Sequence, residues 1–206
     1  MPTELEAVAA EAAGCTRCRL HQSRTQVVFG QGDPHADLMF VGEAPGFHED
    51  RQGIPFVGPS GQLLNRLLEG IGLRRQDVYI CNVVKSRPPQ NRDPQPDEIA
   101  ACRPWLDAQI RLVDPKVVVT LGNFAAKTLL ETTTGITRLR GQTYPFQGRV
   151  LLPTFHPAAA LHAQGRRTAG PSPLEAMEGD FRVLAELLAA AAPVDEDRPT
   201  EQLGLF

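Results

Sequence analysis

Three polar residues, Glu43, Asn82 and His156, stand at the ends of apolar runs that have the composition of buried strands. In an open parallel sheet the carboxyl ends of the strands meet at one edge, where ligands bind, so the three side chains are expected to face a single pocket. A carboxylate can orient or deprotonate water, a carboxamide can pair with a donor and an acceptor on a pyrimidine edge, and an imidazole can stabilise negative charge on a leaving group. Together these groups suit a hydrolase that reads a base.

Each of the three residues also has a plainer interpretation. Glu43 lies in the glycine-rich turn GEAPG and can be an ordinary solvated side chain. Asn82 can be a structural tie, because a buried amide costs free energy unless it is hydrogen-bonded. His156 precedes Pro157, which favours the first turn of a helix, so it can be a helix cap. The sequence leaves these alternatives open.

The elements that must position these residues alternate between strands and helices. Strands are expected over residues 38–41, 78–84 and 116–121, with a fourth that ends at Pro153 after a hairpin within residues 140–152. Helices are expected from the capping box of Thr3 and Glu6 to Gly14, from Ser60 to Gly72, from Asp97 to about Leu112, and over residues 123–130 and 174–190. The alternation predicts an α/β fold with three layers, α/β/α, around a central, mostly parallel four-stranded sheet.

Length and composition indicate an ordinary globular protein, with 206 residues of which 42% are hydrophobic and 22% charged. We expect one domain over residues 1–192 and a disordered acidic tail over residues 193–206. No apolar run of about 18 residues and no export signal is recognisable, so the expected location is the cytoplasm, without a membrane span. The net charge of −3 argues only weakly against a nucleic-acid partner, because several acidic residues lie at the two ends.

The four cysteines suggest metal or redox chemistry in preference to disulfides. Cys15 and Cys18 form a C-x-x-C motif, whereas Cys81 and Cys102 are isolated in the sequence. A single C-x-x-C is a weak signal, which gains weight only if other soft ligands converge on it.

Four motifs, GEAPG, GIPFVGPSGQLL, NVVKSRPPQNRDP and FHPA, occur in this order. In order and separation they resemble the family 4 uracil-DNA glycosylases, the iron-sulfur branch of the uracil glycosylase superfamily. The similarity runs from about Cys15 to the last predicted helix. It implies a monofunctional enzyme that removes uracil from single- and double-stranded DNA and leaves an abasic site.

The resemblance also implies a role for each matching position. Glu43 is expected to position the attacking water and to balance the sugar cation, and His156 to donate to uracil O2 as charge builds there. Asn82 is expected to pair with the uracil edge and to exclude cytosine. The other expected substrate-binding residues are Phe56, which would stack on the extruded base, Gly42, Glu49 and Asn91.

Contacts with DNA are expected from arginines and from one apolar wedge. The base must leave the duplex before its glycosidic bond is accessible, and uracil opposite guanine should be extruded at the lowest cost. Leu161 is a candidate to fill the vacated stack, although a core leucine is the plainer interpretation. The candidates for phosphate contacts, each of which can equally be a solvated surface charge, are Arg87, Arg92, Arg138, Arg140, Arg166 and Arg167.

The family holds a four-iron cluster with four cysteines, and this chain departs from that pattern at one position. Cys15, Cys18 and Cys102 match, but Ser86 replaces the remaining cysteine. We therefore expect a 4Fe-4S cluster of reduced stability that is prone to lose iron, because a hydroxyl is a harder and less acidic ligand than a thiol. Cys81 is not a simple substitute, since it neighbours Asn82 on one strand and must point to the opposite face of the sheet.

Further expectations concern partners and alternatives. A related branch of the superfamily has a histidine where this chain has Asn91 and becomes covalently trapped, so turnover without an adduct is expected here. The terminal QLGLF resembles a peptide that binds the bacterial sliding clamp, although five residues match easily by chance. We expect a monomer. The alternative functions are a non-catalytic iron-sulfur module that binds uracil or DNA and a small redox protein.

Overall fold

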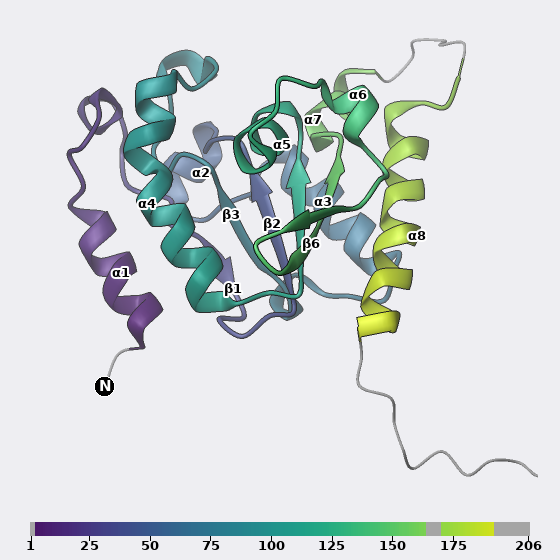
Figure 1. Ribbon diagram of the computed structural model, residues 1–206. Helices are drawn as coiled ribbons and strands as arrows, with labels where there is room; N and C mark the ends of the chain where they lie inside the picture. Colours follow the sequence, from purple (N-terminus) through teal and green to yellow (C-terminus); the bar gives the residue numbers. More distant parts are fainter. Residues whose placement is uncertain (1–2, 164–169, 192–206) are drawn as a thin grey trace, which may run out of the picture.

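A mixed sheet of six strands in the order β1-β3-β2-β4-β6-β5 forms the centre of the computed structural model, which describes residues 3–163 and 170–191 (Figure 1). The four central strands are parallel, namely β2 (Leu38–Gly42), β3 (Tyr79–Asn82), β4 (Val117–Leu121) and β6 (Arg149–Thr154). The edge strands β1 (Gln31–Gly32) and β5 (Tyr144–Phe146) are antiparallel to their neighbours.

The predicted α/β class is thus confirmed, but the predicted number of strands is too low. β5 is the first arm of the expected hairpin, which is joined to the sheet. β1 was not expected, because its two exposed residues lie in a turn-rich stretch with no apolar pattern.

Alternation along the strands divides the core between the two faces of the sheet. Met39 and Val41 point to one face, and Leu38 and Phe40 point to the other. Helices α4 (Pro96–Val113) and α5 (Asn123–Leu130) cover the first face. Helices α3 (Pro59–Glu69), α7 (Pro157–His162) and α8 (Pro173–Ala191) cover the second face (Figure 1). The three predicted layers are therefore present, and helix α1 (Glu4–Ala13) packs outside them against α4.

Prolines decide where two of the helices begin. Helix α1 has the predicted capping box and ends before Gly14. Helix α3, however, begins at Pro59 with Gly58 as its cap instead of Ser60, and α4 begins at Pro96 with Gln95 as its cap instead of Asp97. Proline at the first helical position has a suitable φ and lacks an N–H that would need a partner. Helix α3 also ends at Glu69, before the expected stop at Gly72.

Short elements complete the described chain. They are α2 (Phe47–Gln52), α6 (Ile136–Leu139) and the 3-10 turns η1 (Arg19–Gln22), η2 (Arg75–Asp77) and η3 (Pro89–Asn91). None of the helices in residues 3–163 and 170–191 has the length and apolar character needed to cross a membrane. The predicted tail at residues 193–206, the QLGLF segment, Arg166 and Arg167 lie outside the described residues.

Candidate active site

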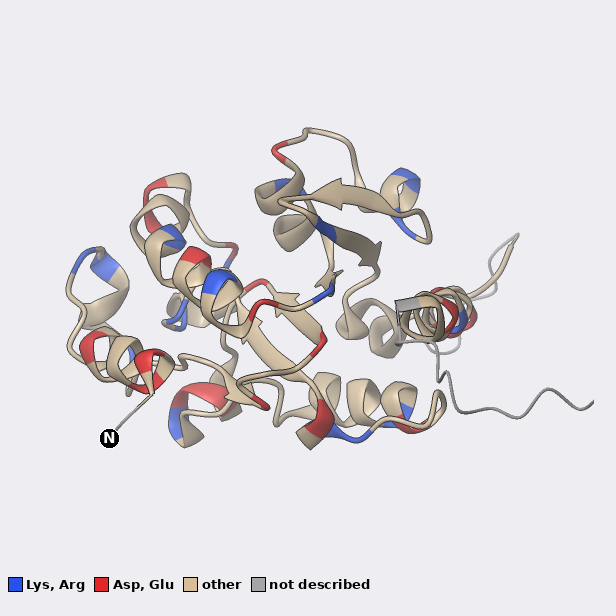
Figure 2. Cartoon of the chain, turned by 60° about the horizontal axis from the view of Figure 1, so that its bottom comes forward, with Lys and Arg blue, Asp and Glu red and all other residues tan. Residues whose placement is uncertain are grey.

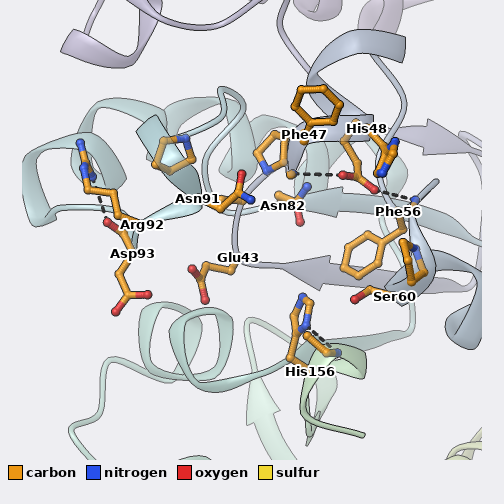
Figure 3. Close-up of a pocket in the computed structure, with 18 of the residues that line it drawn as sticks. Glu43, Phe47, His48, Phe56, Ser60, Asn82, Asn91, Arg92, Asp93 and His156 are labelled. Atoms are coloured by element: carbon orange, nitrogen blue, oxygen red, sulfur yellow. Dashed lines mark hydrogen bonds between the residues drawn. The ribbon is translucent and has the colours of Figure 1, made fainter. Parts of the chain in front are cut away.

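A cavity of about 640 Å³ lies beyond the carboxyl ends of β2, β3 and β6, and Glu43, Asn82 and His156 all line it (Figure 3). Two backbone bonds continue the pairing of β2 with β3 past the strand ends. The N–H of Val83 donates to the carbonyl of Gly42 at 2.9 Å, and the N–H of Val84 donates to that of Glu43 at 3.1 Å. These bonds fix Glu43 relative to Asn82, and His156 lines the same cavity, so the three polar residues meet at one edge of the sheet as expected.

Asn82 presents an unpaired polar group inside the protein. Its side chain is only 1% exposed, and Oδ1 has no hydrogen-bond partner in the described chain. A buried acceptor left without a donor costs about 1–3 kcal/mol, so a purely structural tie would normally be satisfied. An amide held at the pocket in this state is suited to a ligand that supplies the missing donor.

His156 combines the two interpretations that the sequence left open. It is the N-cap of α7, where Nδ1 accepts from the backbone N–H of Ala158 at 3.2 Å. That bond assigns the ring proton to Nε2, which points into the pocket (Figure 3). Burial lowers the pKa of His156 to about 4, although Glu49 opposes the shift. At neutral pH the ring is therefore an uncharged donor.

Phe56 forms a wall of the pocket from a backbone conformation that is unusual for phenylalanine. Its φ is +51°, in the left-handed region, and its ring centroid lies 5.7 Å from that of His156. A Cβ at Gly42 would lie 2.5 Å from the Phe56 ring, and a Cβ at Gly61 would lie 1.7 Å from the Phe56 carbonyl oxygen. Gly42 itself is buried and does not line the pocket. It leaves room for the ring, which differs from the substrate contact that the resemblance implied.

The side chains of Glu49 and Arg75 form hydrogen bonds with the backbone around Phe56. The Glu49 carboxylate accepts from the N–H groups of Gly46 at 3.1 Å and of Val57 and Gly58 at 2.9 Å each. The Arg75 guanidinium donates to the carbonyl of Phe56 at 3.0 Å and to the carbonyl of Pro55. Sequence reasoning missed Arg75, because nothing in its local pattern distinguishes it from the exposed Arg74 beside it.

The contacts of Arg75 lead to a testable prediction. The Arg75→Ala variant should lower the free energy of unfolding by about 1–3 kcal/mol, because two carbonyls lose charged donors. If Phe56 stacks on a base, KM should rise about 10- to 100-fold with a smaller change in kcat, because the wall is displaced. Arg75→Lys should recover part of this loss, and Arg74→Ala is the matched control. Equal kinetics for Arg74→Ala and Arg75→Ala would contradict the role in positioning Phe56.

Glu43 is the acidic side chain at the centre of the labelled pocket residues, and it is half-buried (Figure 3). Burial and the nearby charge of Asp93, which also lines the pocket, raise the pKa of Glu43 to about 7. The carboxyl group thus exchanges its proton near neutral pH, where a general base is most effective. The plain solvated turn that the sequence allowed does not fit this environment.

Two of the four described candidates for phosphate contacts are held in ion pairs with buried carboxylates. Arg92 binds the buried Glu98 through two bonds of 2.6 and 2.8 Å, and Arg140 binds the buried Asp180. Arg87 donates to Oδ1 of Asn91 at 2.7 Å beside the pocket, which Asn91 lines. Basic and acidic residues are mixed over the elements drawn in Figure 2. A shared basic face of the six arginines therefore stays a prediction.

Leu161 does not line the pocket. Its side chain is half-buried and packs against the core on the α3, α7 and α8 face of the sheet. This placement agrees with the core interpretation of Leu161, and its insertion into DNA stays a prediction.

The residues that the resemblance assigns to iron lie in one region, near the beginning of α4. Cys102 is buried and accepts from the backbone N–H of Lys85, next to Ser86. Burial raises the pKa of the Cys102 thiol against the opposing effect of Lys85, and nearby Cys18 and Cys15 raise it further. Within the described residues, no three His, Cys, Asp or Glu side chains form a ready metal site.

The fourth position differs from the other three. The Ser86 hydroxyl is buried and accepts from the Arg24 guanidinium at 3.2 Å. Cys81 packs in the core beneath α4 and α5, on the face of the sheet that Asn82 does not use, as its place on the strand predicted. Cys15, Cys18 and Cys102 carry soft thiol groups, whereas the fourth position carries a hard oxygen that already has a partner.

The sequence profile of the uracil DNA glycosylase superfamily matches residues 29–182 of this chain. The chain therefore belongs to the uracil DNA glycosylase superfamily. The type-4 uracil-DNA glycosylase of Sulfurisphaera tokodaii is 45% identical over 192 residues, which cover 89% of this chain and 84% of the relative. The type-4 enzyme of Archaeoglobus fulgidus is 42% identical, with 92% and 96% covered, and that of Thermotoga maritima is 47% identical, with 76% and 83% covered. Within the superfamily these similarities place the chain with the type-4 enzymes, as its four motifs indicated.

Proposed function

We propose that the protein is a DNA repair enzyme of base excision repair, which hydrolyses the N-glycosidic bond of uracil in DNA and leaves an abasic site. The observation that carries this proposal is the buried, unpaired carboxamide oxygen of Asn82 in a pocket shared with Glu43 and His156. Uracil presents an N3–H donor beside an O4 acceptor, so a side-chain amide can pair with both. Cytosine presents the opposite pair, so an amide in the orientation that pairs with uracil is left unsatisfied by it.

The proposed reaction separates charge at the glycosidic bond. The bond between C1′ of deoxyribose and N1 of uracil breaks, and its electron pair leaves with the base. The uncharged Nε2–H of His156 donates to uracil O2, where negative charge accumulates. The Glu43 carboxylate balances the cationic sugar, orients water toward C1′ and takes the proton that this water loses. The Phe56 ring covers one face of the extruded base.

The environment of Lys85 supports hydrolysis by water without a lyase step. Lys85 belongs to the NVVKS motif and is only 2% exposed. Its ammonium group donates to the backbone carbonyl of Asn82 and to Oε1 of Gln109. This lysine therefore supports the strand below the pocket and is not presented to the sugar as an amine nucleophile.

A cleavage assay tests the proposed activity. The protein is incubated with matched oligonucleotides that contain uracil, thymine or cytosine at one position, and alkali then breaks the strand at any abasic site. We expect strand breaks only in the uracil substrate, in both single strands and duplexes, and no band of reduced mobility on denaturing gels. Intact uracil DNA after long incubation with excess protein would contradict the proposal.

We further propose that Cys15, Cys18 and Cys102 hold an iron-sulfur cluster, with Ser86 at the fourth corner. The support is that Cys15 and Cys18 lie near enough to raise the pKa of Cys102, together with the similarity of the chain to type-4 enzymes. When bound, such a cluster would tie the segment after α1 to α4 and to the loop after β3, and it has no part in the proposed hydrolysis. The predicted clamp contact, monomeric state and cytoplasmic location stay predictions.

Exchange of the fourth ligand gives the second prediction. The Ser86→Cys variant, purified without oxygen, should retain more iron per chain and absorb more strongly in the visible range than wild type, because a thiolate replaces a hard oxygen ligand. The control is Cys81→Ala, which should leave the iron content unchanged. Iron lost from that control would place the fourth ligand at Cys81, and iron absent from wild type and Ser86→Cys alike would exclude the cluster.

A further inference from the structure

Phe47 is an exposed aromatic residue on the rim of the candidate active site. Its side chain is 44% exposed, although it lines the same cavity as Glu43 and His156. In the close-up it lies across the pocket from His156, beside His48 (Figure 3). The only other large hydrophobic side chain exposed within the described residues is Leu174, at 37%. A single exposed hydrophobic side chain is common on protein surfaces, but Phe47 also lines the cavity, where it can contact a bound substrate.

Two arginines pack against this ring. The guanidinium carbon of Arg51 lies 4.8 Å from the ring centroid and that of Arg87 lies 5.2 Å from it. The ring also meets His48 edge to face, with centroids 5.4 Å apart. In the described chain neither Arg51 nor Arg87 forms an ion pair with a carboxylate, in contrast to Arg92 and Arg140. The tip formed by Phe47, Arg51 and Arg87 is therefore apolar at its centre and positively charged around it.

Duplex DNA complements this tip in shape and charge. When a base is extruded, the stack is left with a gap that a flat apolar side chain can fill, and the phosphates beside the gap are negatively charged. Leu161, the wedge candidate from the sequence, is partly buried against the core and does not line the pocket. Phe47 lines the pocket from an exposed position, so it can reach the stack while the base occupies the cavity.

We propose that Phe47 inserts into the base stack that the extruded uracil vacates, while Arg51 and Arg87 contact the flanking phosphates. This inference rests on the proposed glycosylase function and adds the means by which the enzyme holds a duplex substrate open. Insertion matters only where a paired stack must be kept open. Phe47 is therefore a determinant of activity on duplex DNA more than on single strands.

Single-turnover kinetics on two substrates test the role of Phe47. Wild type and Phe47→Ala are compared on a duplex with one uracil opposite guanine and on the same uracil strand without its complement. We expect the maximal rate on the duplex to fall on the order of 10- to 100-fold, the contribution of one aromatic stacking contact, while the single-strand rate stays within about 3-fold. Phe47→Trp should retain duplex activity, because it preserves a stacking surface.

The controls separate this inference from the proposed function. Leu174→Ala removes the other exposed large hydrophobic side chain, away from the pocket, and should leave both rates unchanged. An equal loss on duplex and single strand would make Phe47 a pocket residue and overturn the insertion, as would wild-type rates for Phe47→Ala on both substrates. If wild type itself releases no uracil from either DNA, it is the glycosylase proposal that fails.

Discussion

The His156→Ala variant is expected to release uracil about 100- to 1000-fold more slowly than wild type in single-turnover assays, because one oxyanion-type donor contributes this much to a transition state. Nδ1 of His156 is engaged with the Ala158 N–H, so Nε2 is the donor that faces the base. Since burial lowers the pKa of this ring to about 4, its contribution should be independent of pH above about pH 5. The loss is expected in kcat, because the charge on uracil O2 develops only as the bond breaks.

Two companion variants separate catalysis from folding at this position. His156→Ala also removes the cap of α7, which costs about 1 kcal/mol of stability, so thermal unfolding is measured beside the kinetics. His156→Gln retains an N–H donor and should recover part of the rate. His35→Ala, in an exposed turn, controls for loss of a histidine. Wild-type single-turnover rates in a folded His156→Ala variant would refute its role.

The strands and the edge they share were predictable from the sequence, because the signal is local. The run of residues 38–41 is apolar throughout and stops at a glycine-rich turn, and β2 ends within one residue of the expected position. Parallel pairing then brings Glu43, Asn82 and His156 together, since chain order and strand polarity determine which ends meet. The two-residue β1 carries no such pattern, and its pairing depends on the neighbouring β3 alone.

The side chains that hold the site residues in position could not be predicted, because they act through contacts between segments distant in the sequence. Arg75 lies 19 residues from Phe56, whose carbonyl it binds, and Glu49 reaches Gly58 nine residues away. Arg140 was expected to contact phosphate, yet Asp180 on α8 accepts from it 40 residues later in the chain. A surface arginine and a buried one have the same local sequence pattern, and only the tertiary fold decides between them.

The pH dependence of the reaction provides the second large effect, through Glu43. Its pKa is raised to about 7 by burial and by Asp93, and the proposed reaction requires the ionised form. The rate should therefore rise with pH through about 7 and then level off. Glu43→Gln cannot ionise and should lose about 100- to 10,000-fold in rate together with this dependence. Asp93→Asn removes a neighbouring negative charge, so the midpoint should move to lower pH, whereas Asp107→Asn on the outer face of α4 should leave it in place.

The Glu43→Gln variant, which should lose activity, should gain stability at neutral to alkaline pH. The folded pKa of Glu43 lies above its ordinary value of 4.5, so between pH 4.5 and 7 the folded state keeps a proton that the unfolded state releases. Stability therefore falls as the pH rises through this window, and above it the folded protein holds a partly buried charge. Glu43→Gln removes that cost and should unfold at a higher temperature than wild type at pH 8, while the two proteins converge near pH 4. If Glu43→Gln were inactive but no more stable than wild type at pH 8, burial would not be raising the pKa of Glu43. If the midpoint were unshifted in Asp93→Asn, Asp93 would not contribute to the raised pKa of Glu43.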